Sequence, residues 1–344
     1  MFKFEKNSVS SVIKNLNKGK VLVIGDFALD EMIYGHTSRI SREAPVLILK
    51  HNNTNIILGA AANAAHNIST LNNGKATAIG VYGDDYHGPV LLETLKHSRI
   101  DTSLMVMDKS RVTTTKTRIS GFSTQSVTQQ IVRIDRESNT NVSGDLENKI
   151  IDNIRKAIPE HDAVLLSDYD LGMMTQEIID ISIETANNCG KFIAVDTQLG
   201  LERFKNVTVL TPNQPDAEKS LGYLINSPEK VIQAGKDLIE LTNSKMILLT
   251  RGDEGMVIFE SNGNHAFIPA FNKTDVFDVT GAGDTVVASF TLGICAGASS
   301  LDSAIIGNLA ASIVIKHFGC ATTTANELMF NLERLNMEDF TIRV

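Results

Sequence analysis

The chain has 344 residues, of which 42% are hydrophobic and 21% charged, close to the usage of ordinary globular proteins. Its net charge of −8 argues against a nucleic-acid partner, because such proteins usually carry a basic stripe. The three cysteines, Cys189, Cys295 and Cys320, are far apart and form no CxxC pair, so neither a zinc site nor a disulfide framework is predicted.

The first residues predict an amphipathic helix rather than a secretory signal. Val9, Val12 and Ile13 recur at helical spacing, and no continuous apolar segment precedes them. The longest apolar-rich stretch, residues 285–298, is shorter than the ~20 residues that a membrane span needs. We therefore expect a cytoplasmic protein with no membrane partner.

Short apolar runs alternate with amphipathic segments along the chain. Strands are predicted over residues 21–24, 76–79, 163–166, 192–195, 207–210, 246–249 and 257–259. Most of the intervening segments have helical periodicity, for example at Ile179, Ile183 and Ala186. This alternation predicts an α/β fold with a mostly parallel, helix-covered sheet.

Two stretches interrupt that alternation. Residues 31–57 contain a β-like run but no good helix, and residues 102–135 are rich in Thr, Ser, Val and Ile. Together they predict a small β-sheet that stands off the main body as a lid or a dimer surface. The alternative is a set of antiparallel strands on the edge of the main sheet. No repeat or linker is visible, so we expect one domain over residues 1–344 with an inserted lid.

Polar residues follow several of the predicted strands. Asp26, Asp168, Asp196, Asn213 and Arg251 each lie at or just past a strand end. In open α/β sheets, ligands bind at the carboxyl ends of the strands. Each residue alone could instead cap a helix or a turn, but together they favour a polar-ligand site.

A loop of small residues, Asp278 to Thr285, runs directly into an apolar helical segment. Its glycines, Gly281 and Gly283, allow close approach of a ligand, and a helix start favours phosphate. Asp284 in the first turn could cap the helix or accept a proton during phosphoryl transfer. The chain lacks the P-loop, HExxH and GxSxG signatures, which excludes those enzyme classes, and it lacks the dinucleotide fingerprint, which argues against a dinucleotide-binding enzyme.

Two further segments carry candidate polar groups. Gly59 leads an Ala-rich helix start in which Asn63 is either a ligand or part of a tight helix–sheet contact. Lys116 and Arg118 alternate on one predicted strand and Arg133 follows on the next. These cations could hold a phosphate or carboxylate, or they could form a solvated strand face.

From about residue 21 to residue 324, the chain resembles the ribokinase-like carbohydrate kinases. Within that family it is most similar to the kinase domain of bacterial D-glycero-D-manno-heptose 7-phosphate kinases. The segments that carry the resemblance are VLVIGDFALDEMIYGHTSRISREAPV, QQIVRIDRE, LLSDY, VLTPN, LLTRGDEGM and DVTGAGDT.

The resemblance implies a ribokinase-like three-layer sandwich with a β-sheet lid, ATP and Mg²⁺ as cofactors, and possible use of a monovalent cation such as K⁺. It implies that Asp284 is the base and that Gly281, Ala282 and Gly283 form the anion hole. The implied substrate-binding residues are Asp26, Asp30, Gly59, Asn63, Lys116, Arg118, Arg133 and Asp168. The implied nucleotide-binding residues are Asn213, Asp216, Thr250, Gly252, Gly255 and Asn308, with Asp216 also reaching the metal, directly or through water.

The predicted reaction is phosphorylation of D-glycero-D-manno-heptose 7-phosphate at its anomeric hydroxyl, on the route to ADP-heptose and lipopolysaccharide, by a homodimer paired through its lids. Several positions depart from the family pattern. Asp216 replaces the usual Glu and Ala60 replaces a Gly, while Leu171 replaces a Lys and Thr197-Gln198 replaces a Pro-Lys of the heptose kinases. Three alternatives remain: a kinase of fructose, ribose or fructose phosphate, a non-catalytic sugar- or nucleotide-binding regulator, and, against the missing fingerprint, a nicotinamide-dependent oxidoreductase.

Overall fold

The structure, a computed structural model, describes residues 5–123, 126–273, 275–335 and 342–343. Within these residues nine strands form one large sheet in the order β15-β14-β13-β12-β11-β10-β1-β4-β6. They are β1 (Val21–Gly25), β4 (Ala76–Ile79), β6 (Ile100–Asp101), β10 (Ala163–Asp168), β11 (Phe192–Thr197), β12 (Val209–Leu210), β13 (Met246–Thr250), β14 (Met256–Glu260) and β15 (His265–Ile268). Neighbours from β6 to β13 pair in parallel, whereas β13, β14 and β15 pair antiparallel.

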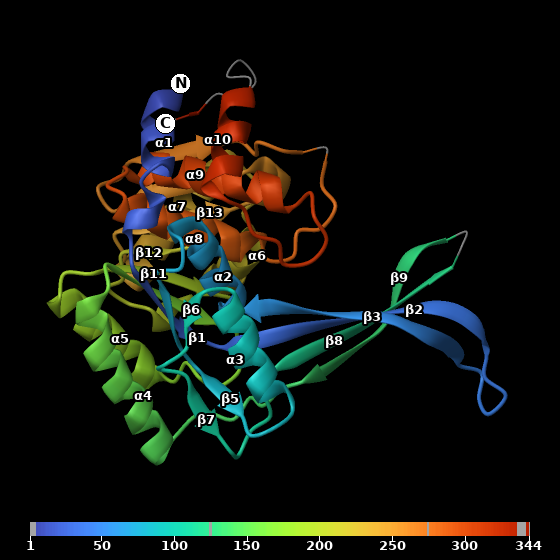
Figure 1. The fold of residues 1–344 in the computed structure, drawn as a ribbon. Coiled ribbons are helices and arrows are strands. Elements are labelled where there is room, and N and C mark those ends of the chain that lie inside the picture. Colours follow the sequence, from blue (N-terminus) through green and yellow to red (C-terminus); the bar gives the residue numbers. More distant parts are fainter. Residues whose placement is uncertain (1–4, 124–125, 274, 336–341, 344) are drawn as a thin grey trace.

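Helices cover both faces of this sheet (Figure 1). One side carries α1 (Lys6–Ile13), α2 (Ala61–Asn72), α3 (His87–His97), α8 (Ala282–Cys295), α9 (Ser300–Val314) and α10 (Ala325–Arg334). The other carries α4 (Gly144–Ala157), α5 (Gln176–Asn188), α6 (Gln214–Leu221) and α7 (Pro228–Thr242). In β1, Val21 and Val23 face the first layer while Leu22 and Ile24 face the second, as the two-residue repeat of a strand requires. The fold is therefore the predicted three-layer α/β sandwich.

Short 3₁₀ turns join some of these elements. They are η1 (Leu16–Lys18), η2 (Ile158–Glu160), η3 (Leu201–Arg203) and η4 (Gly252–Glu254). The predicted strand over 207–210 is shorter in the structure and begins at Val209. Just before it, the side-chain hydroxyl of Thr208 accepts the Ile193 N–H at 3.1 Å.

A second sheet projects from the body (Figure 1). It has the order β3-β2-β8-β9 and consists of β2 (Phe27–Ile40), β3 (Leu47–Ala60), β8 (Thr115–Ser123) and β9 (Ser126–Arg136). We call these four strands the projecting sheet. Its four strands form a sheet of their own and do not extend the edge of the main sheet.

The boundaries predicted for the lid need correction. The projecting sheet begins earlier than residue 31, because β2 continues from the end of β1. Residues 102–114 are not part of it: β7 (Val106–Asp108) pairs in parallel with β5 (Val81–Gly83) against the main body, where Val106 is buried. Residues 124 and 125 of the predicted lid lie outside the described part of the chain.

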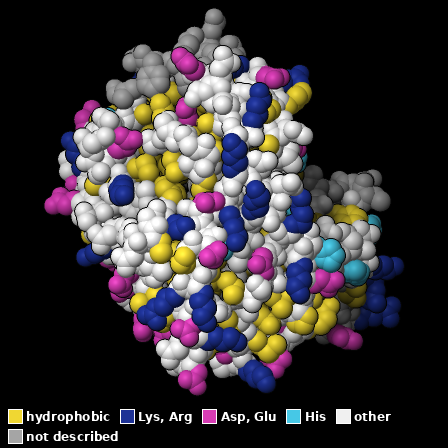
Figure 2. All heavy atoms as spheres, turned by 60° about the vertical axis from the view of Figure 1, so that its left-hand side comes forward, with side chains coloured by type: hydrophobic (Ala, Val, Ile, Leu, Met, Phe, Trp, Pro, Cys, Tyr) yellow, Lys and Arg dark blue, Asp and Glu magenta, His cyan; other side chains and the backbone are white. Residues whose placement is uncertain are grey.

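Among the described residues, no helix is both long and apolar enough to cross a bilayer. The face drawn in Figure 2, turned away from the projecting sheet, carries Lys and Arg side chains interspersed with Asp and Glu. Charges of both signs therefore share this surface.

Candidate active site

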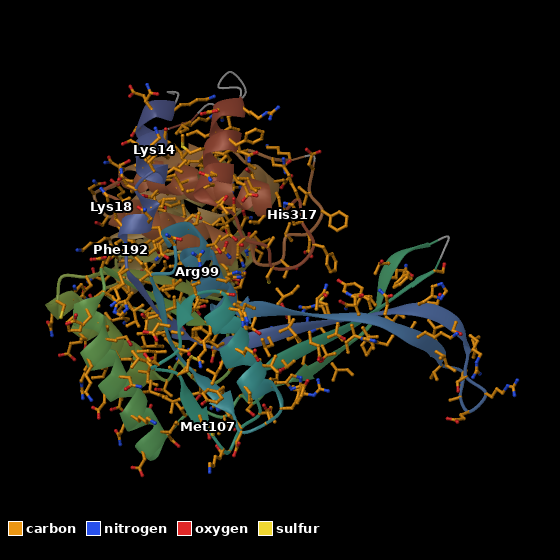
Figure 3. All side chains as sticks on the ribbon, viewed as in Figure 1. Lys14, Lys18, Arg99, Met107, Phe192 and His317 are labelled. Atoms are coloured by element: carbon orange, nitrogen blue, oxygen red, sulfur yellow. The ribbon has the colours of Figure 1, made fainter. Side chains whose placement is uncertain are left out.

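A cavity of about 350 Å³ lies where the carboxyl ends of β10–β13 meet the base of the projecting sheet. Its lining includes ten of the predicted site residues: Asp30, Gly59, Lys116, Arg118, Asn213, Asp216, Thr250, Gly281, Gly283 and Asp284. Figure 3 shows the labelled His317, close in sequence to the lining residue Cys320, on the side of the body that carries the projecting sheet. The fold thus brings segments from both ends of the chain to one site.

Asp284 lies in the first turn of α8, and its side chain is buried. Its Oδ2 accepts a hydrogen bond from Asn63 Nδ2 at 2.7 Å, and its Oδ1 accepts one from the Tyr169 hydroxyl at 2.9 Å. Both bonds favour the ionised carboxylate. Because Asp284 still borders the cavity, it can meet a ligand while its orientation is fixed from two sides.

The contact between α2 and α8 explains why Asn63 occupies a helix interior. Asn67 Nδ2 donates to Asn63 Oδ1 at 3.2 Å, and the Thr285 hydroxyl donates to Asn67 Oδ1 at 3.0 Å. The oxygen of the Asn63 amide is thereby satisfied, which leaves its Nδ2 directed at Asp284. Asn63 supports the carboxylate from behind and does not line the cavity.

Gly281 makes this packing possible. Its φ of +75° is a left-handed conformation that side chains disfavour, and a Cβ at this position would lie 2.4 Å from Asn63 Nδ2. Gly283, two residues later, has open space around it. The packing against Asn63 therefore requires a glycine at position 281, whereas the space around position 283 would admit a side chain.

Carboxyl groups in the cavity are held in a shared electrostatic environment. Burial raises the pKa of Asp284 to about 6, although the hydrogen bonds from Asn63 and Tyr169 lower it. Burial, with the neighbouring Asp284, also raises the pKa of Asp196 to about 7. At neutral pH, Asp284 is mostly ionised and can accept a proton.

The projecting sheet contributes the cations of the cavity. Arg118 Nη1 lies 2.5 Å from Asp30 Oδ1, so the charge of Arg118 is paired within the sheet. Lys116 forms no ion pair with any described residue, and its Nζ lies 5.9 Å from the centre of the Tyr169 ring. Gly59 admits the Asp30 side chain, because a Cβ there would lie 3.1 Å from Asp30 Oδ2. Lys116 is thus available for an anionic ligand.

The opposite side of the cavity is formed by the start of α6 and the end of β13. Asn213 caps α6, with its Oδ1 accepting the Asp216 N–H at 2.8 Å, and Asn213 pairs with Thr250 in an isolated β-bridge. Burial raises the pKa of Asp216. The side chains of Asn213 and Asp216 border the cavity together with Asp196.

Three predicted substrate-binding residues have other contacts. Asp26 is buried and accepts the backbone N–H groups of Tyr169, Leu171 and Met173, so it organises the loop after β10. Asp168 is buried against Arg203, 2.8 Å from Nη1. Arg133 forms an ion pair with Asp135 on its own strand. None of these three side chains lines the cavity.

Four further predicted residues also lie outside its lining. The Ala282 N–H donates to the Val279 carbonyl at 3.2 Å, so it is not a free donor of an anion hole. Asn308 Nδ2 donates to the Pro269 carbonyl at 2.8 Å. Gly252 and Gly255 have φ values of +58° and +90° around η4, which explains the glycines by backbone conformation.

Some lining residues were not among the predicted site residues. They are Ala28, Ala60, Tyr169, Asp196, Thr197, Gln198, Thr211, Val279, Thr280 and Cys320. The strand-end pattern pointed to Asp196, and Tyr169 directly follows the predicted Asp168. No local sequence pattern pointed to Cys320, because its position depends on how the segment after α9 packs against the projecting sheet. There Cys320 Sγ lies 3.7 Å from Asp30 Oδ2.

The chain belongs to the pfkB family of carbohydrate kinases, which it matches over residues 18–327. It is therefore a phosphotransferase that uses a sugar hydroxyl as acceptor, and the predictions of family, fold class and enzyme class are confirmed.

Curated relatives at moderate identity carry the name bifunctional protein HldE. The protein from Pelobacter propionicus is 34% identical over 326 residues, which cover 94% of this chain and 65% of that protein. The protein from Helicobacter pylori is 36% identical over 316 residues, covering 92% of this chain and 66% of its own length. The chain thus spans about two-thirds of the length of these relatives.

Solved structures with the same fold include Arabidopsis thaliana ribokinase complexed with ribose and ATP, with a TM-score of 0.71 and 17% identity over 92% of this chain and 99% of that one. Phosphofructokinase-2 from Escherichia coli, in complex with substrates and products, has a TM-score of 0.73 and 18% identity over 92% of this chain and 98% of that one. At this identity the likeness shows the fold.

We predict opposite effects of alanine at the two loop glycines. Gly281→Ala lowers the free energy of unfolding by about 1–3 kcal/mol, because the residue must hold a left-handed φ and displace Asn63. Gly283→Ala leaves that free energy unchanged or raises it by up to about 1 kcal/mol, since its Cβ meets nothing and alanine favours a helix. Urea denaturation followed by circular dichroism measures both, and equal losses would contradict the geometry.

Proposed function

We propose that the chain transfers the γ-phosphoryl group of ATP to the anomeric hydroxyl of D-glycero-D-manno-heptose 7-phosphate. The observation that carries this proposal is that one cavity holds both a fixed carboxylate, Asp284, and a cation, Lys116, that forms no ion pair within the described part of the chain. The similarity to the bifunctional HldE proteins supports the choice of substrate. The product would be the 1,7-bisphosphate, a precursor for ADP-heptose and lipopolysaccharide.

In this reaction the acceptor hydroxyl gives its proton to Asp284, and its oxygen forms a bond to the γ-phosphorus. The bond between that phosphorus and the bridging oxygen of ADP breaks, and ADP leaves with the electron pair. Gly281 and Gly283 border the start of α8, where the helix dipole and the first-turn N–H groups other than that of Ala282 favour the negative phosphoryl group. The chain's contribution is thus positioning, proton acceptance and stabilisation of charge.

The remote phosphate of the sugar would bind at the projecting sheet. Lys116 is available as a point charge, and Arg118 can share its guanidinium between Asp30 and a phosphate oxygen, because it carries five donors. Asp30 can accept from sugar hydroxyls through its remaining lone pairs. The projecting sheet would act as a lid that excludes water during transfer.

ATP and Mg²⁺ would occupy the side of the cavity bordered by Asn213, Asp216 and Thr250. Among the described residues, no group of three or more His, Cys, Asp or Glu is arranged to hold a metal ion. A site with fewer than three such ligands is compatible with Mg²⁺, because this ion is usually bound by one or two carboxylates together with substrate phosphates. Asp216 is the carboxylate we assign to it, directly or through water, and the bound ion would offset phosphate charge.

Among sugars offered with ATP and Mg²⁺, we predict that heptose 7-phosphate gives the highest kcat/KM, measured as ADP release. The panel pairs heptose with heptose 7-phosphate and fructose with fructose 6-phosphate, and includes ribose. Each assay is run with and without K⁺, because Escherichia coli phosphofructokinase-2 has been crystallised in complex with potassium. Preference for another sugar would overturn the heptose assignment, and ATP binding with no turnover on any sugar would favour a binding protein.

A variant of the cation separates recognition of the phosphate from general binding. Lys116→Met is expected to lower kcat/KM for heptose 7-phosphate by roughly 10–100-fold, the scale of one charge-assisted contact, and to lower that for heptose much less. Lys156→Met, on the exposed face of α4, is the matched control and should change neither value. Equal losses on both sugars would remove Lys116 from the phosphate site.

Removal of the carboxylate base is predicted to slow the reaction strongly. Asp284→Asn should lower kcat by roughly 10²–10⁴-fold, because the amide cannot accept the hydroxyl proton. The variant should keep ATP binding by calorimetry and a wild-type circular dichroism spectrum. Asp152→Asn, at an exposed position of α4, is the control. Turnover near that of the wild type in Asp284→Asn would remove this residue from the mechanism.

We also propose a homodimer paired through the projecting sheets. Ile131, Val132 and Ile134 of β9 and Ile40 and Leu47 at the far end of β2 and β3 are exposed apolar side chains, with 43% to 66% of their surface accessible. Exposed apolar strands are typical of an interaction surface. Sedimentation at micromolar concentration tests this proposal, and a monomer throughout would contradict it.

A further inference from the structure

Tyr169 connects three parts of the cavity. It follows β10 directly, its ring borders the cavity, and its hydroxyl donates to Asp284 Oδ1 at 2.9 Å. The other oxygen of Asp284 is held by Asn63 at 2.7 Å from α2. The carboxylate is thus clamped between one donor from a helix and one from a strand-end loop, and the reaction described above has no step that uses the tyrosine.

The backbone of this loop is itself fixed by a buried carboxylate. Asp26 Oδ2 accepts the N–H groups of Tyr169 at 2.9 Å and Leu171 at 3.2 Å, and its Oδ1 accepts that of Met173 at 3.2 Å. Asp26 lies at the end of β1 and is 4% exposed. A carboxylate with three backbone donors is a rigid anchor, so Tyr169 cannot leave Asp284 without breaking the anchor or changing its rotamer.

On its other side, the tyrosine ring meets the projecting sheet. Lys116 Nζ lies 5.9 Å from the ring centre. The other charged and titratable groups near this pair are Asp30, Arg118 and Asp135 from the projecting sheet, Asp196 from β11, and Cys320. Burial, with the charges of Asp284 and Asp196, raises the pKa of Tyr169 well above its usual range. Tyr169 therefore remains a hydroxyl donor at neutral pH.

We propose that Tyr169 is a positioning residue for the base: its hydroxyl holds the Asp284 carboxylate ionised and oriented toward the acceptor hydroxyl, and its ring aligns Lys116 above the same substrate. This inference rests on the proposed kinase reaction. Each carboxylate oxygen has two lone pairs, so the bonds from Tyr169 and Asn63 leave acceptor sites for the substrate. Asp26 acts one step further back, as the anchor of Tyr169.

The test is the pH dependence of kcat/KM in Tyr169→Phe, which keeps the ring and removes the hydroxyl. The wild-type value should fall as the pH drops below about 6, where Asp284 becomes protonated. Loss of a donor to the ionised form raises the pKa of a carboxyl group. In Tyr169→Phe the acid limb should therefore move upward by about 1 pH unit, the scale of one charge-assisted hydrogen bond. At pH 7 that shift lowers the ionised fraction of Asp284, and with it kcat/KM, roughly 2-fold.

Tyr223→Phe is the matched control. Its hydroxyl also donates to a carboxylate, Asp237 Oδ2 at 2.7 Å, but it joins the middle of α7 to the loop that precedes this helix, outside the cavity. This variant should keep the wild-type profile. Thermal melting of both variants shows whether either loses stability, so a folding defect is recognised separately.

The outcomes separate this inference from the proposed function. Turnover by Asp284→Asn at the wild-type rate would remove the base itself, and with it the whole proposal. An inactive Asp284→Asn with a Tyr169→Phe profile that superposes on that of the wild type would overturn the role of Tyr169 alone. A lower kcat with an unmoved acid limb would assign Tyr169 to packing, which also overturns it.

Discussion

The carboxylate of Asp284 is buried at the start of α8, and several distant segments supply the hydrogen bonds that this burial requires. An ionised group away from water must be hydrogen-bonded, and Asp284 is satisfied by Asn63 from α2 and by Tyr169 from the loop after β10. Those two donors need their own supports, which are the Asn67–Thr285 chain and the Asp26 anchor. A left-handed glycine, Gly281, then becomes necessary because Asn63 fills the space of its side chain. The sequence feature DVTGAGDT is therefore one half of a packing arrangement whose other half lies more than 200 residues earlier in the chain.

The projecting sheet supplies the positive charge of the cavity. Parallel strands buried on both faces end in carboxylates and amides, and the cations of the cavity come from β8. Arg118 is already paired with Asp30, so the sheet keeps its own charge balanced near an acidic cavity, while Lys116 stays available to a ligand. An anionic sugar would complete this balance, which gives a physical reason for a phosphorylated substrate beyond the similarity to the HldE proteins. The departures at Leu171 and Gln198 lie in different surroundings. Leu171 is buried and is held through its backbone, whose N–H donates to Asp26 and whose carbonyl accepts from Arg111, whereas Gln198 borders the cavity.

Much of the fold follows from local patterns in the sequence. Runs such as VLVIG and AVLLS can only be strands buried on both faces, and their alternation with amphipathic segments implies the layered sheet. The loop that leads into α8 and the cations on β8 could also be predicted from the sequence, because each depends on residues close together in the chain. The pattern could not decide between a ligand role and a structural role for a polar strand end. Asp26, Asp168 and Asp196 all follow or end a strand in the same way, yet among these three only Asp196 borders the cavity. Asp26 instead accepts backbone N–H groups, and Asp168 forms an ion pair with Arg203. Cys320 and the true start of the projecting sheet depend on tertiary contacts alone.

The most direct measurement is a crystal structure of the protein with a non-hydrolysable ATP analogue, Mg²⁺ and heptose 7-phosphate. The account predicts that the anomeric hydroxyl lies within roughly 2.6–3.2 Å of an Asp284 carboxylate oxygen, the reach of a general base. It also predicts the γ-phosphate at the start of α8 beside Gly283 and the sugar phosphate on Lys116. A sugar bound with its acceptor hydroxyl directed away from Asp284, or a nucleotide bound outside this cavity, would contradict the central claim.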